Sequence, residues 1–135
     1  MKLKIEHIGI MLTLTILALA YGPSYSQSDV INNVKNALKS GSSKELAKFL
    51  NQNVDVTIGD DFQTFSKTQA EYALRDFFKE NVPDSFTIIH QGASKGNLHF
   101  FIGKYTSNSN AFRVFLRIKN ISGRYLIHEI SFTKE

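Results

Sequence analysis

Two histidines carry the clearest chemical potential in this sequence, because each lies in a segment that alternates between apolar and polar residues. His128 is in phase with Ile130 and Phe132, and His90 is in phase with Phe86. Side chains two residues apart in a strand point to the same face, so both imidazoles are predicted to point inward. A desolvated histidine can act as a general acid or base. The alternative for each is an ordinary core, rim or turn residue with ordinary hydrogen-bond partners.

Tyrosines and carboxylates are the groups that could assist such a histidine. Tyr72 and Tyr105 could each donate a hydrogen bond to an oxyanion, although nothing in the sequence shows that they meet a histidine. Asp55 alternates with Val56 and is predicted to point outward, which argues against a role as general base. The pair Asp60-Asp61 follows a glycine, as is expected of a turn. The candidate catalytic set is therefore His128, His90, Tyr105 and Tyr72.

Other kinds of site find little support in the residue pattern. The sequence has no cysteine and no histidine pair at the spacing of a helical metal site. Gly92 and Gly96 flank a turn and lack the pattern of a phosphate-binding loop. The Gly-x-Ser-x-Gly motif of many serine hydrolases is missing. We therefore predict neither a metal nor a cofactor.

The first 26 residues have the three parts of a secretory signal peptide. Two lysines precede an uncharged apolar run, Ile8–Ala20, and small residues follow it at Ser24 and Ser26. The run is shorter than the roughly 20 residues of a membrane-spanning helix, so no permanent membrane anchor is expected. Cleavage near Ser26, leaving Gln27 first, predicts a periplasmic or secreted protein.

Residues 27–135 are expected to form a single domain. Removal of the signal peptide leaves 109 residues and lowers the formal net charge from +4 to +3. The remaining basic residues are scattered, so nucleic acid is not an expected partner. The absence of cysteine excludes disulfides and favours a bacterial source.

Three helices are predicted, after caps at Ser28, Ser42 and Ser66. Apolar residues at helical spacing support each of them. Gly41 provides a left-handed stop for the first helix, which covers 29–40. The apolar stripe of the second runs to Leu50, and the third ends before a proline.

Strands are predicted from residues that alternate between two faces. A short hairpin comes before the third helix, and four antiparallel strands follow it, near 85–93, 98–106, 111–119 and 124–133. In the third of these, Phe112 and Leu116 are predicted to face the core, whereas Arg113, Phe115 and Arg117 face outward.

This order of elements resembles the nuclear transport factor two-like superfamily, which includes ketosteroid isomerase and polyketide cyclases. The resemblance implies an α+β, cystatin-like cone, in which three N-terminal helices pack on a strongly curved antiparallel sheet. It also implies a pocket at the open end of the cone and homodimers formed through the outer sheet face. Fold alone does not determine chemistry.

Several stretches are also similar to small secreted Bacteroidota proteins of unknown function. They are residues 66–70, 74–78, 86–92 and 101–105. Membership of that family would bring no known activity with it.

Three functions follow as hypotheses. The leading one is an exported, non-catalytic module that binds a small apolar ligand or a protein partner. The second is an isomerase, dehydratase or cyclase that uses His128, and the third is a structural homodimer with Arg113, Phe115 and Arg117 at its contact. The predicted pocket residues are Tyr72, Phe77, His90, Phe112, Leu116 and His128.

Overall fold

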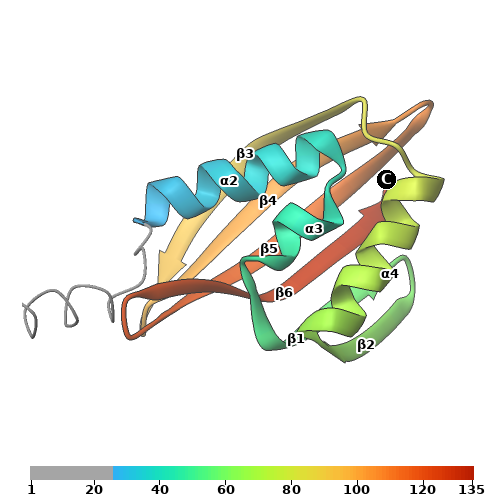
Figure 1. Ribbon diagram of the computed structural model, residues 1–135. Helices are drawn as coiled ribbons and strands as arrows, with labels where there is room; N and C mark the ends of the chain where they lie inside the picture. The colour runs from blue at the N-terminus through green and yellow to red at the C-terminus, as the bar shows by residue number, and fades with distance from the viewer. Residues whose placement is uncertain (1–25) are drawn as a thin grey trace, which may run out of the picture.

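The computed structural model describes residues 26–135, which form one six-stranded sheet with helices on one of its faces (Figure 1). The predicted signal peptide lies outside the described residues, apart from Ser26. In chain order the elements are α2 (Gln27–Ser40), α3 (Ser43–Ala47), β1 (Leu50–Ile58), β2 (Asp61–Ser66), α4 (Lys67–Glu80), β3 (Ser85–Ser94), β4 (Leu98–Ser107), β5 (Asn110–Ile121) and β6 (Arg124–Lys134).

Helix α2 begins two residues before its predicted start. Ser26, not Ser28, is the N-cap, because the Ser26 hydroxyl accepts a hydrogen bond of 3.3 Å from the backbone N–H of Asp29. At the other end Gly41 has a φ of 67°, the left-handed conformation predicted for the stop. Ser26 therefore has a structural role as the cap of α2.

Ser42 and Ser66 cap α3 and α4 as predicted. Ser66 and Gln69 form a complete capping box, in which each side chain accepts a hydrogen bond from the other residue's backbone N–H. Helix α3 ends at Ala47 rather than extending through Leu50. Leu50 instead begins β1, opposite Ile127 of β6, where both side chains are buried. Burial against the sheet thus outweighs the helical spacing of Leu50.

The strands form the predicted hairpin and the predicted antiparallel meander. Strands β1 and β2 pair antiparallel, as do β3 with β4, β4 with β5 and β5 with β6. A further pairing was not predicted: β1 lies parallel to β6. It joins hairpin and meander into one sheet of order β2-β1-β6-β5-β4-β3.

The α+β class is confirmed, but the strong curl implied by the family resemblance is not seen. In the described part of the chain β2 and β3 are the two edges of the sheet, and no pairing joins them. The sheet is therefore open, not closed or strongly curled (Figure 1).

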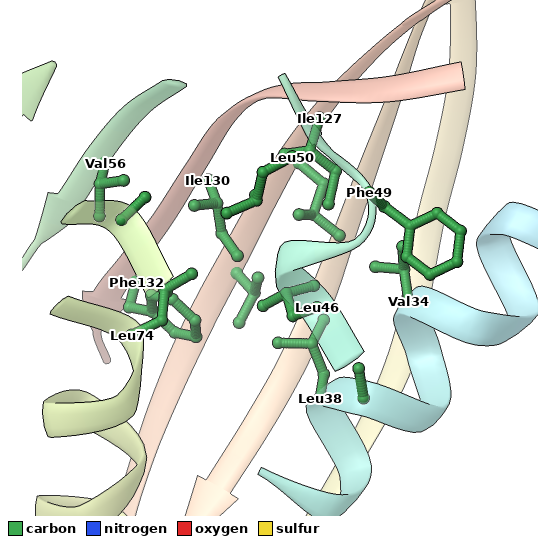
Figure 2. Close-up of a cluster of buried hydrophobic side chains, with 14 of the residues drawn as sticks. Val34, Leu38, Leu46, Phe49, Leu50, Val56, Leu74, Ile127, Ile130 and Phe132 are labelled. Carbon is green, nitrogen blue, oxygen red and sulfur yellow. The ribbon is translucent and has the colours of Figure 1, made fainter. Parts of the chain in front are cut away.

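The core lies between the helices and one face of the sheet. Figure 2 shows Val34 and Leu38 of α2, Leu46 of α3, Leu74 of α4 and Ile130 of β6 in one cluster of buried side chains. All five side chains are at most 2% exposed. Because the helices cover this inner face, the opposite face, called the outer face from here on, is left without a covering element in the described residues.

Candidate functional site

The predicted inward orientation of His128 is wrong, because a β-bulge changes the phase of β6. Ile127 and Glu129 lie opposite consecutive residues of β5, so His128 between them is an extra residue. Ile127 and Ile130 are both fully buried on the inner face. His128 instead interacts with Arg117, which points outward from β5. The bulge therefore moves the best catalytic candidate to the outer face.

The surroundings of His128 favour its neutral form. Its Nδ1 lies 3.4 Å from the side-chain amide nitrogen of Asn51, which is a hydrogen-bond donor. Burial lowers the pKa of His128, the charges of Arg117 and Lys119 lower it further, and Asp55 opposes them. Nε2 is buried and has no hydrogen-bond partner among residues 26–135.

A second bulge has the same effect on His90. Ile88 lies opposite Gly103, and His90 lies opposite the preceding residue, Ile102, so Ile89 is the extra residue in β3. The predicted inward orientation of His90 is therefore wrong as well. His90 is exposed at the edge of the sheet, on the outer side.

The two candidate tyrosines lie apart from both histidines. Tyr72 is 54% exposed on α4, and the guanidinium carbon of Arg75 lies 4.7 Å from the centre of its ring. Tyr105 is fully buried on the inner face, where its hydroxyl donates to the backbone carbonyl of Asn81 at the end of α4. Burial, and to a lesser extent the charge of Asp84, raises the pKa of Tyr105. Tyr105 is therefore a structural donor.

The remaining predicted pocket residues belong to the core. Phe77, Phe112 and Leu116 are all less than 8% exposed. The ring of Phe77 lies 5.3 Å from that of Phe112 and 4.1 Å from that of Phe132, measured between centroids. These three side chains therefore contribute to aromatic and aliphatic packing in the core.

Arg117 organises the charged groups of the outer face. Its Nη2 lies 3.4 Å from Glu129 Oε2 on β6 and 3.7 Å from Asp55 Oδ2 on β1. Thr64 of β2 donates a hydrogen bond of 2.7 Å to Asp55 Oδ1. The cluster thus spans four adjacent strands. Since each charged side chain is about one-third exposed, each pair contributes at most about 1 kcal/mol.

An apolar strip lies beside this cluster and consists of Phe100, Ile102 and Phe115. The rings of Phe100 and Phe115 are stacked at 6.4 Å, and Ile102 lies opposite Phe115 in the β4–β5 pairing. All three side chains are only half-buried, although they are apolar. Phe115 was predicted to point outward, but Phe100 and Ile102 were missed, because β4 is apolar in both of its phases.

The outer face divides into halves of opposite charge. By the pairing registers, the outward positions of β2, β1 and β6 include the carboxylates Asp55 and Glu129, and their one basic residue is Arg124, at the first position of β6, so this half has a net negative charge. The outward positions of β5, β4 and β3 include no carboxylate. They carry the basic residues Lys104, Arg113, Arg117 and Lys119.

The candidate catalytic side chains do not converge within residues 26–135. Tyr105 faces the helices, both histidines face away from them, and Tyr72 lies on the exposed side of α4. Among residues 26–135 no group of three or more His, Asp or Glu side chains is placed to hold a metal ion. No helix in this range is long and apolar enough to cross a membrane.

Comparisons with known proteins agree with this fold. A 1.27 Å crystal structure of a DUF4783 family protein from Bacteroides uniformis is similar, with 32% identity and a TM-score of 0.73 over 77% of this chain and 95% of that one. An NTF-2-like protein of unknown function from Silicibacter pomeroyi has 13% identity and a TM-score of 0.59, over 80% and 92% of the two chains. A protein from Nostoc punctiforme with a cystatin-like fold has 11% identity and a TM-score of 0.62, over 82% and 80%. The last two likenesses concern the fold alone.

No protein with a curated functional description matches the chain. The family model described as "Domain of unknown function (DUF4783)" matches residues 31–133, which include nearly all of the described domain. The predicted resemblance to NTF2-like proteins and to proteins of unknown function from Bacteroidota is thereby confirmed. The chain belongs to the DUF4783 family.

Proposed function

We propose that the processed chain is an exported, non-catalytic interaction module that forms a homodimer through its outer sheet face. The separation of the candidate catalytic groups supports a role without catalysis. The half-buried apolar strip supports a role in binding. We do not carry forward a ligand in the cone, because Phe77, Phe112 and Leu116 pack in the core and the other three residues predicted to line it lie outside the core.

The observation that carries this proposal is the charge division of the outer face. The boundary between the two halves runs between β6 and β5, which is also the middle of the six-stranded order. A two-fold axis that lies in this face and runs along the boundary, parallel to the strands, would place the acidic half of each copy on the basic half of the other. The same surface patch then meets itself, as a two-fold interface requires. A second copy is therefore the partner that the face fits by charge.

Within such a dimer, Phe115 would lie near the axis with the apolar strip around it. Arg117 already pairs with Asp55 and Glu129 within each copy, so Lys104 and Lys119 would be additional basic groups beside those carboxylates of the partner. Arg113 is partly compensated by Glu135, with 3.6 Å between Nε and Oε1. We expect the strip to supply most of the affinity and the charges to set the orientation.

Replacing Phe115 with lysine tests this interface. A central aromatic hot spot is worth about 2 kcal/mol or more, so Phe115→Lys should raise the dimer dissociation constant at least about 30-fold. Sedimentation equilibrium of residues 26–135, which contain the whole described core, gives this constant. Tyr72→Lys, which changes an exposed aromatic residue on α4, is the matched control and should leave it unchanged.

A wild-type domain that stays monomeric at high concentration would contradict the proposal. So would a dimer that Phe115→Lys leaves intact. The unfolding midpoint of each variant shows whether the fold survives the substitution.

A further inference from the structure

Strand β3 is the edge of the sheet next to the apolar strip. One side of β3 pairs with β4, and the other side has no strand partner in the described residues. An edge strand with free backbone N–H and C=O groups is a template for another strand. After the bulge at Ile89, residues 90–94 pair regularly with β4, so this stretch has the backbone geometry that an added strand needs.

A groove runs along β3 on its inner side, between the strand and α2, which lie beside each other in Figure 1. It consists of two adjoining hollows of about 410 and 350 Å³, which share Ile31, Asn32 and Gln91. Phe101 contributes to one hollow and Ile88 to the other. The groove therefore offers apolar contact within reach of the edge.

A third hollow lies against the same stretch of β3 and includes side chains of the outer face. It has a volume of about 190 Å³, and its walls include His90, Phe100 and Ile102. Gly92 leaves room over the ring of Phe100. Successive side chains of a strand point to opposite faces, so a strand added to β3 would place them alternately in the groove and in this hollow.

We propose that β3 is a docking edge for an extended peptide segment of a protein partner, which adds to the sheet as a further strand. Backbone hydrogen bonds to residues 90–94 would supply affinity. The groove and the hollow would select apolar side chains at alternate positions of the segment.

The charge of the residues that line the three hollows indicates which charge the docked segment should carry. Lys35 of α2 is the only lysine, arginine or carboxylate among the residues that line the three hollows. The best fit is therefore an extended segment with an acidic residue that faces Lys35. A second copy paired edge to edge would bring basic groups to basic groups, so charge favours a partner segment over self-pairing.

Selection from a random decapeptide display library against residues 26–135 tests this inference. We expect enriched peptides to alternate apolar residues and to carry an acidic residue. Addition of such a peptide should slow hydrogen exchange at the amides of residues 90–94. Enriched peptides without alternation, or slowed exchange elsewhere, would overturn the proposal, as would a selection with no enrichment.

Variants on both sides of the strand sharpen this test. Lys35→Glu should weaken binding of an acidic peptide about tenfold or more, whereas Lys39→Glu, one turn later on the same helix and outside the groove, should not. Gly92→Leu should fill the hollow and weaken binding more than Gly92→Ala. Both substitutions are compatible with the backbone, because φ at Gly92 lies outside the left-handed region that favours glycine. Equal binding by all four variants would overturn the proposal.

The docking edge and the proposed dimer can be separated by experiment. Phe100 and Ile102 belong to both surfaces, so the peptide assay is repeated with Phe115→Lys. We expect this variant to bind the peptide at least as well as the unchanged chain. Slowed exchange at residues 90–94 that depends on protein concentration, without peptide, would show self-pairing of β3 and overturn the inference.

Discussion

At the scale of single residues, two histidines decide how this domain is interpreted. Strand alternation predicts that both point inward, yet each lies on the outer face. The cause is a β-bulge in each strand: Ile89 is the extra residue before His90, and His128 is itself an extra residue. A single extra residue reverses the phase of everything that follows. On the outer face, the imidazole of His128 therefore lies near the charges of Arg117 and Asp55 rather than in an apolar pocket.

His128 should make the stability of the domain depend on pH. Its pKa is lowered in the fold, so the unfolded chain binds a proton more readily. The contribution of His128 is complete above its unfolded pKa of about 6.5 and is lost as the pH falls through that value toward the folded pKa. We expect His128→Gln to reduce the loss of unfolding free energy between about pH 8 and pH 5, measured in urea.

His90→Gln is the matched control for this titration. It makes the same substitution at an exposed side chain, where the free energy of unfolding should change little. An unchanged pH dependence in His128→Gln would show that other groups determine the acid sensitivity of the fold.

At the scale of elements, most of the fold could be predicted from the sequence. Caps at Ser42 and Ser66 and the stop at Gly41 are local signals, and they were interpreted correctly. The limits of the four long strands agree with the structure to within two residues. What could not be predicted is the parallel pairing of β1 with β6, because the two strands lie far apart in the chain and no local pattern specifies their contact.

Because the pairing of β1 with β6 could not be predicted, the sequence predicts only part of the outer face. The outward orientations of Asp55, Arg117 and Glu129 all follow from alternation. Their convergence requires β1 and β6 to be neighbours. The bulges were equally hidden, since neither Ile89 nor His128 is a residue that marks a bulge as glycine can.

The position of the α2 cap gives a prediction about this helix and about processing of the chain. Loss of an N-cap hydroxyl costs about 1 kcal/mol, so Ser26→Ala should lower the free energy of unfolding by about that amount. Ser28→Ala is the control and should have a smaller effect, because the Ser28 hydroxyl contacts only that of Ser26 in an exposed setting. Chemical denaturation of both variants measures the difference.

Cleavage after Ser26 would remove this cap from the exported protein. Ser26 also anchors α2 through its carbonyl, which accepts a hydrogen bond of 3.0 Å from the N–H of Val30. We therefore expect mass spectrometry of the exported protein to show an N-terminus that retains Ser26. An intact precursor in the cytoplasm would contradict the proposal of export, and a start at Gln27 would contradict the role given to Ser26.

At the scale of the whole molecule, the domain separates stability from interaction. The inner face and the helices bury the large apolar side chains in one cluster. The outer face and the β3 edge keep apolar and charged groups half-exposed, where they add little to stability. Function is therefore expected on the outer face and at the β3 edge.

The most direct test of the proposed dimer is to reverse one charge in each half of the outer face, in two separate variants, and then to mix these variants. Lys119→Glu makes the basic half less basic, and Glu129→Lys makes the acidic half less acidic. Each variant alone would set like charges against each other across the two-fold axis, whereas a mixed dimer would restore opposite charges on both sides. Sedimentation velocity should show each variant as a monomer and an equimolar mixture as a dimer. A mixture that remains monomeric, or variants that still dimerise alone, would contradict the account.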